Sequence, residues 1–278
     1  MTKRRQFLRN TATGLFGLSM ISVEPALGGD ASEQALYYRY PAIHDEGSYG
    51  VVNAAHTDLN KVKELVANRP ELAGASWDWG FGDYETALGA ASHMGRRDIA
   101  EYLISFGARP DIFTFAMMGM LKSVQEMIET FPGIQGHRGP HGITLLKHAQ
   151  NRYNAKDIPG EDKANVEKVI AYLEKVGGAN IPAPSLTLSE EEKKIFSGEY
   201  RFGNNETEIF TVAPANFDPA NLRIIRKGLP GRLMFKVDEN TFSPTGAPAV
   251  RIVFDRKDGQ VVSLTIHEPQ PVVKAARI

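Results

Sequence analysis

Residues 82–111 read GDYETALGAASHMGRRDIAEYLISFGARPD, and this stretch decides the fold. Asp83 can cap a first helix, and Gly95 can end it because glycine tolerates left-handed backbone. A second helix begins near Asp98, with apolar residues at helical spacing on one face: Ile99, Tyr102, Leu103 and Phe106. The stretch therefore predicts a helix–turn–helix unit whose apolar face a neighbouring unit must cover.

Copies of this unit are expected on both sides, since one unit cannot bury its apolar face alone. Upstream, AAHTDLNKVKELVANRPEL at 54–72 aligns with ASHMGRRDIAEYLISFGAR at 91–109, and His56 matches His93. A shorter copy follows at 115–128, and a fourth occupies 142–180 with an insertion between its two helices. The sequence therefore predicts four stacked units.

The order of small, glycine and apolar positions resembles the ankyrin repeat. Thr86-Ala87-Leu88 stands where that family has Thr-Pro-Leu-His, and Ala90-Ala91, Gly95 and Gly107-Ala108 follow in the family's order. Ala87 and Gly89 depart from the family's proline and histidine. The resemblance covers residues 48–180 and implies an all-α ankyrin repeat solenoid that works by binding other proteins.

A second domain begins after the prolines of 181–187, and its pattern changes to the period of two that is typical of strands. FSGEY at 196–200 and FSPTG at 242–246 resemble small β domains appended to bacterial exported hydrolases. The predicted fold class is thus α + β: the solenoid at 48–180, a linker at 181–187, and a small antiparallel β-sheet or half-barrel at 188–278.

The N-terminus resembles an export signal of the twin-arginine type, with RRQFL at 4–8 before a weak apolar run. We expect a cleaved signal peptide at 1–28, a linker at 29–47, a location in the bacterial periplasm, and no stable membrane anchor after cleavage. The net charge of −1 gives no basic face for nucleic acid, and the lack of cysteine excludes disulfides and thiol chemistry.

Both tryptophans lie in the loop at 75–84, and tryptophan is a residue type that often anchors a protein partner. Burial between neighbouring repeats is the equally weighted alternative. The predicted partner-binding residues are Trp77, Trp79, Asp83, Tyr84, His56, His93, Arg96, Asp111 and Phe113.

No cofactor, no metal site and no enzyme activity are expected from the sequence. His56 and His93 could be metal ligands, but no third ligand has matching spacing, so hydrogen bonds to the backbone of the next finger loop are expected instead. The chain lacks the Gly-x-Ser-x-Gly and His-Glu-x-x-His motifs. A hydrolase that uses His56, His93 and Asp83 is the weakest hypothesis.

The sequence therefore predicts an exported ankyrin-repeat protein that mediates protein–protein recognition in the periplasm. The partner would be another protein and not nucleic acid. The alternative is a small-molecule carrier or binding protein, whose ligand would lie in the C-terminal β domain or in the cleft between the two domains.

Replacing both Arg4 and Arg5 by lysine should stop export of the folded protein, because the twin-arginine route reads this pair. Cell fractionation measures the outcome, with Arg9→Lys as a control that leaves the pair intact. Normal periplasmic accumulation of the double variant by the twin-arginine route would show that the signal has been misread.

Overall fold

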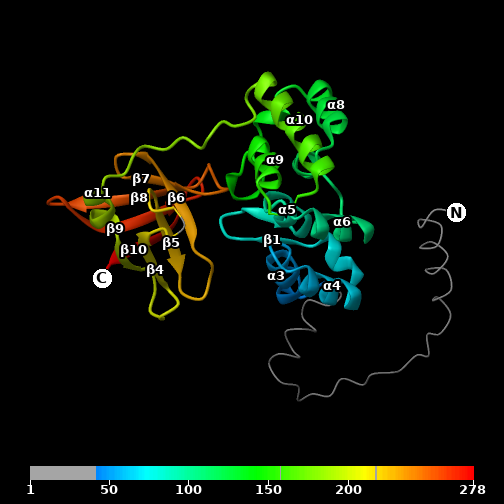
Figure 1. The fold of residues 1–278 in the computed structure, drawn as a ribbon. Helices are drawn as coiled ribbons and strands as arrows, with labels where there is room; N and C mark the ends of the chain where they lie inside the picture. The colour runs from blue at the N-terminus through cyan, green and yellow to red at the C-terminus, as the bar shows by residue number, and fades with distance from the viewer. Residues whose placement is uncertain (1–41, 157, 217) are drawn as a thin grey trace, which may run out of the picture. The chain divides into compact units, whose positions relative to one another are not determined.

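The helices between residues 45 and 176 follow one another in pairs (Figure 1). The computed structural model describes residues 42–156, 158–216 and 218–278, of which 45–278 form one compact unit. The successive pairs are α3 (Asp45–Ala54) and α4 (Leu59–Asn68), α5 (Ala87–His93) and α6 (Arg97–Ser105), α7 (Ile112–Met117) and α8 (Leu121–Thr130), and α9 (Leu145–Tyr153) and α10 (Gly160–Val176).

Four of these helices start at a polar side chain that accepts a hydrogen bond from the backbone N–H three residues later, namely at Asp58, Thr86, Asp111 and Thr144. The sequence predicts Asp83 as the cap of α5, and this prediction is wrong. Thr86 caps α5 because the backbone of 84–86 is extended, and the carboxylate of Asp83 is therefore free for other contacts.

Two glycines allow the helix pairs to approach one another closely. Gly95 and Gly119 have φ of +69° and +72°, which β-carbon-bearing residues rarely adopt. A Cβ on Gly95 would lie 3.0 Å from the backbone of Arg152, and a Cβ on Gly119 would lie 2.9 Å from the nitrogen of Val166. The turn of one pair is therefore packed directly against the backbone of another.

The helical region also contains strands and short 3₁₀ helices. Strands β1 (Ser76–Asp78) and β2 (Tyr84–Thr86) form an antiparallel hairpin in which Trp77 pairs with Glu85. The alternation of a strand exposes Tyr84 and buries Glu85. The 3₁₀ helices are η1 (Pro70–Gly74), η2 (Ile134–Gly136) and η3 (Pro140–Gly142).

The C-terminal region is a closed antiparallel β-barrel preceded by the helix α11 (Glu190–Phe196) (Figure 1). Strands are hydrogen-bonded in chain order, and the last strand closes the barrel on the first. The strands are β3 (Gly198–Arg201), β4 (Ile209–Pro214), β5 (Leu222–Arg226), β6 (Arg232–Asp238), β7 (Thr241–Pro244), β8 (Arg251–Lys257), β9 (Gln260–His267) and β10 (Pro271–Arg277).

Aromatic side chains fill the core of the barrel. Phe196 from α11 packs against Phe242 and Phe254 with ring centroids 4.9 and 5.0 Å apart, and Tyr200 lies 5.6 Å from Phe254. All four rings belong to one buried apolar cluster. These contacts favour a packed barrel core over a ligand cavity inside the barrel.

The predicted fold class, an all-α solenoid followed by a small sheet or half-barrel, is wrong. The helical region carries the β1–β2 hairpin, and the β region is a fully closed barrel. Sequence periodicity misses β7 because it has only four residues, and it misses β10 because that strand begins with Pro271 and ends in an Ala-Ala-Arg run with weak strand preference. β10 pairs with both β9 and β3 and so closes the barrel.

The expected signal peptide and most of the expected 29–47 linker lie outside the described residues. Among the helices that the structure describes, none combines the length and the hydropathy that crossing a bilayer requires. The export route and the periplasmic location stay predictions from the sequence.

Ala91→Leu should destabilise the protein by about 1–3 kcal/mol through overpacking. Ala91 has no exposed surface, and its helix α5 packs against α3, α7 and α9. Thermal or urea unfolding measures the change, with Ala67→Leu on the exposed face of α4 as the matched control. Equal stability of the two variants would contradict the tight packing around α5.

Candidate metal centre

Three histidines and one glutamate converge from four separate elements of the helical region. His56 follows α3, His93 is the last residue of α5, His141 lies in η3, and Glu85 is the middle residue of β2. One nitrogen or oxygen atom from each side chain lies within 4.8 Å of the corresponding atoms of the other three. Imidazole nitrogen and carboxylate oxygen are the ligands that Zn²⁺ and related divalent ions take from proteins.

Glu85 lies at the centre of this cluster and is only 1% exposed. Its Oε1 is 2.9 Å from His93 Nδ1, and its Oε2 is 3.3 Å from His56 Nε2 and 3.4 Å from His141 Nε2. Ligand atoms around a tetrahedral zinc ion lie about 3.3 Å apart, given bonds of 2.0–2.1 Å. The two distances from Oε2, to His56 and to His141, match that spacing.

His56 presents a lone pair to the carboxylate. Its Nδ1 donates to the carbonyl of Val52, in the preceding helix α3, at 3.0 Å. Burial lowers the pKa of His56, although the charge of Glu85 opposes the shift, so the ring is neutral at pH 7. A neutral ring that donates from Nδ1 has only a lone pair on Nε2. Two acceptors therefore face each other across 3.3 Å, an arrangement that a cation between them would stabilise.

The contact between His93 and Glu85 leads to the same conclusion. Both side chains are buried, and their nearest atoms are close but not aligned for a hydrogen bond. His93 Nδ1 and Glu85 Oε1 accordingly have no hydrogen-bond partner among the described residues. Buried polar atoms in native proteins are almost always paired, so two adjacent unpaired atoms need an explanation. A shared metal ion would satisfy both.

Asp83 fixes the orientation of His141. Its Oδ1 accepts the backbone N–H of His141 at 3.0 Å, and its Oδ2 accepts the ring Nδ1–H at 2.8 Å. The ring Nε2 therefore faces the cluster. His141 has φ of +60° and ψ of 19°, a left-handed conformation that costs a non-glycine residue about 1 kcal/mol or more. The two bonds to Asp83 hold it there, as in the carboxylate–histidine–metal pairs of known sites.

The charges of the cluster are strongly coupled. Burial alone would lower the pKa of His141, but Asp83 and Glu85 outweigh burial and raise it to about 9. Burial alone would raise the pKa of Glu85, but the imidazoles of His141 and His93 outweigh burial and lower it to about 2. Without a metal ion, a proton on His141 thus compensates the buried carboxylates at pH 7. A metal ion at Nε2 would replace this proton.

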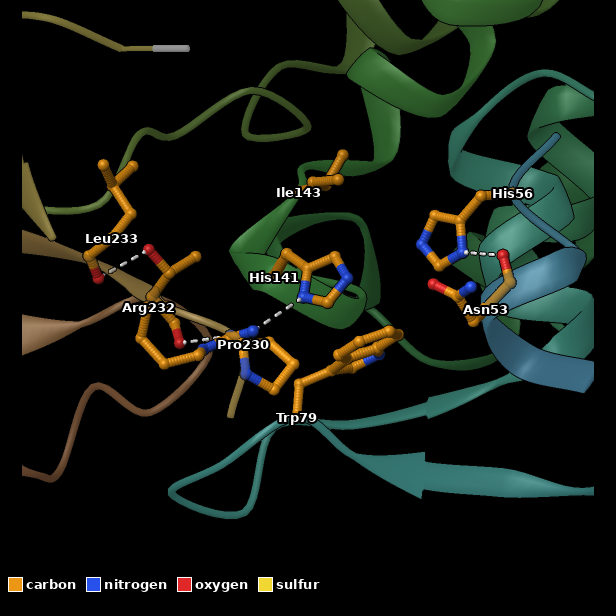
Figure 2. A pocket seen from close by; sticks show the side chains of 10 residues that line it. Asn53, His56, Trp79, His141, Ile143, Pro230, Arg232 and Leu233 are labelled. Carbon is orange, nitrogen blue, oxygen red and sulfur yellow. Dashed lines mark hydrogen bonds between the residues drawn. The ribbon is translucent and has the colours of Figure 1, made fainter. Parts of the chain in front are cut away.

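A pocket of about 460 Å³ adjoins the cluster. Figure 2 shows His141 between His56 on one side and Arg232 on the other, with Trp79 beside it. Trp79 also donates its indole N–H to Glu85 Oε2 at 2.8 Å. The lining residues come from both the helical region and the barrel: Asn53, His56, Trp79, His141, Ile143, Pro230, Gly231, Arg232, Leu233 and Thr245.

The structure brings four of the residues predicted from the sequence into this site: His56, His93, Trp79 and Asp83. The prediction that the rings of His56 and His93 form hydrogen bonds with the backbone of the loop after the next helix pair is wrong. The ring of His56 binds the backbone of the preceding helix α3, and both rings approach the side chain of Glu85.

The other predicted residues lie elsewhere. Trp77 packs against Tyr49 with ring centroids 5.4 Å apart, and Tyr84 is 66% exposed. Arg96 pairs with Asp98, Asp111 caps α7, and Phe113 packs against His148.

Sequence reasoning misses Glu85, His141 and Arg232 as site residues. A helix capped at Asp83 would place Glu85 in its first turn, and only recognition of the three-residue strand reveals that Glu85 faces inward. His141 lies in an irregular glycine-rich turn at 136–141, so it shares no repeat position with the other two histidines. Arg232 comes from the barrel, and no pattern in the sequence links it to Asp83.

Comparison with known proteins found no match for this chain among protein-family models, curated proteins or solved structures.

His148 should make the protein less stable in acid. It is fully buried, and burial lowers its pKa to about 4 in the folded protein, against about 6.5 in an unfolded chain. The unfolded state therefore takes up the proton first, and stability is lost as the pH falls from 6.5 towards 4. The predicted loss at pH 4 is about 3 kcal/mol.

The variant His148→Asn keeps a donor for the carbonyl of Thr144, which His148 Nδ1 contacts at 2.9 Å. Urea unfolding of both proteins between pH 7 and pH 4 measures the difference. As the pH falls, the free energy of unfolding should decrease more for the wild type than for the variant. Parallel pH profiles would contradict the low pKa.

Proposed function

We propose that this protein binds a divalent transition-metal ion through His56, His93, His141 and Glu85, and that the ion acts on a small molecule in the adjoining pocket. The observation that carries the proposal is the convergence of these four ligand atoms within 4.8 Å. The lone pairs of His56 and Glu85 face each other, and the nearest atoms of His93 and Glu85 are unpaired. Zn²⁺, Co²⁺ and Ni²⁺ suit such nitrogen-rich sites.

The pocket favours a ligand-binding centre over a purely structural one. Four protein ligands close a structural zinc site, whereas a catalytic site keeps a position for water or substrate; beside the four ligands here, that position would be a fifth one. His56 and His141 both line the 460 Å³ pocket, so a metal ion bound to them would be reached from this pocket. A metal ion in that position can polarise a carbonyl or phosphoryl oxygen, or lower the pKa of bound water.

The remaining residues would have supporting roles. Asp83 would orient the imidazole of His141, and Trp79 would hold the carboxylate of Glu85. This proposal develops the alternative that the sequence offers, a small ligand in the cleft between the two regions.

Recognition of another protein stays a prediction from the sequence. The contacts of Trp79 do not favour a role for this residue as a partner anchor. This ring is half-buried in the pocket wall and donates to Glu85, so it is not free to anchor a partner. Tyr84, which points away from the cluster and is 66% exposed, is the aromatic residue of this loop that a protein partner would meet.

The metal-stripped protein should bind one equivalent of Zn²⁺ or Co²⁺, as measured by calorimetry and by the visible spectrum of bound Co²⁺. Glu85→Gln and His93→Ala should each weaken binding at least 100-fold, since loss of an outer partner alone costs roughly 10–100-fold. Asp83→Asn removes such an outer partner of a ligand and should weaken metal binding by about 10–100-fold.

His137→Ala is the matched control, because His137 is exposed and lies outside the cluster, only four residues from His141. It should bind the metal like the wild type. Thermal melts with and without Zn²⁺ separate binding from folding: the ion should raise the melting temperature of the wild type and of His137→Ala, but not that of Glu85→Gln. Wild-type affinity in both ligand variants would refute the metal centre.

A further inference from the structure

Arg232 is the arginine on the barrel side of the pocket. It is the first residue of β6 and is 8% exposed, and it lines the pocket together with Trp79 and His141 (Figure 2). Its aliphatic stem packs against the hairpin loop, where a Cβ on Gly80 would lie 3.9 Å from Arg232 Cγ. The guanidinium is therefore held in place by both regions of the protein.

Among the residues that the structure describes, two of the three guanidinium nitrogens have no acceptor. Nη2 donates to the carboxylate of Asp83 and to the carbonyl of Thr245. Nη1 lies 3.5 Å from His141 Nδ1, but that nitrogen donates its own proton to Asp83 and cannot also accept one. Nε is buried and has no partner among the described residues. Buried donors of this kind normally meet an acceptor.

The charges of the metal-loaded site also leave one positive charge without a counter-ion. Glu85 and Asp83 carry two negative charges, the histidine ligands are neutral, and a divalent ion together with Arg232 carries three positive charges. The described residues that line the pocket include no carboxylate. An uncompensated charge away from water is costly, so a ligand with one negative charge would stabilise this site.

The remaining walls select for an apolar molecule of moderate size. Ile143, Pro230, Leu233 and the indole of Trp79 line the pocket, and its 460 Å³ falls within the usual range for small-molecule sites. A carboxylate carries a single charge at pH 7, whereas a phosphate monoester carries about −1.5 to −2. The single uncompensated charge therefore favours a carboxylate.

We propose that the pocket binds a small carboxylic acid with an apolar body, and that Arg232 receives its carboxylate through Nη1 beside the metal ion. This inference rests on the proposed metal centre and names the class of its ligand. Asp83 would join the two parts of the site, because it contacts both Arg232 and His141.

Titration of the Co²⁺-loaded full chain with hexanoate, hexanamide and inorganic phosphate tests this inference. Hexanoate should bind and perturb the Co²⁺ spectrum, and hexanamide, which has the same shape without the charge, should bind at least about tenfold more weakly. Arg232→Gln should weaken hexanoate binding by roughly 10–100-fold, because it removes charged hydrogen bonds. Arg201→Gln, at an exposed arginine of β3, should have no effect.

Equal affinity for hexanoate and hexanamide, or hexanoate binding that Arg232→Gln leaves unchanged, would overturn the inference. So would tighter binding of phosphate than of hexanoate, or no binding of hexanoate at millimolar concentrations. Arg232→Lys keeps the charge beside Asp83 and should retain part of the affinity, and Co²⁺ binding by each variant shows that it is folded.

The failure of the metal centre can be told apart from the failure of this inference. If the wild type takes up no Co²⁺, the proposed function fails. Hexanoate is then titrated into the metal-free protein and followed by tryptophan fluorescence, since Trp79 lines the pocket. A hexanoate response that Arg232→Gln abolishes would still support the carboxylate site, and an unchanged or absent response would end it.

Discussion

The buried carboxylate of Glu85, surrounded by three imidazoles, is the interaction on which the rest of this site depends. A buried charge costs several kcal/mol unless other groups compensate it. The compensating groups are the imidazoles of His93 at the end of α5 and of His141 in the η3 turn, so the carboxylate is stabilised only when both segments are in place. The same contacts leave lone pairs and unpaired atoms that a metal ion would satisfy.

Asp83 extends this network from the helical region to the barrel. One of its oxygens accepts from both His141 and Arg232, and Gly246 of the barrel approaches it so closely that a Cβ there would lie 2.2 Å from its Cγ. A side chain at position 246 would therefore clash with the carboxylate. The barrel core is filled with apolar side chains, among them aromatic rings, so in the proposed function the barrel would contribute through this outer contact with the pocket.

The sequence predicts the paired helices near 87–105 because glycines and apolar residues recur in a regular order. It also predicts that His56 and His93 occupy equivalent positions, and these two residues do meet. It cannot predict Glu85, whose inward direction depends on a three-residue strand, or His141, whose place depends on an irregular turn. Closure of the barrel depends on β10, a strand with weak local preference whose partner β3 lies far away in sequence.

Anomalous diffraction from a crystal of the Zn²⁺-soaked protein, collected at the zinc absorption edge, tests the central claim most directly. We predict one strong peak with Nε2 of His56, Nε2 of His141, Nδ1 of His93 and a carboxylate oxygen of Glu85 as ligands, at the bond lengths of about 2.0–2.2 Å that zinc requires. A structure in which these four side chains keep their contacts with each other, while zinc binds only elsewhere or not at all, would contradict it.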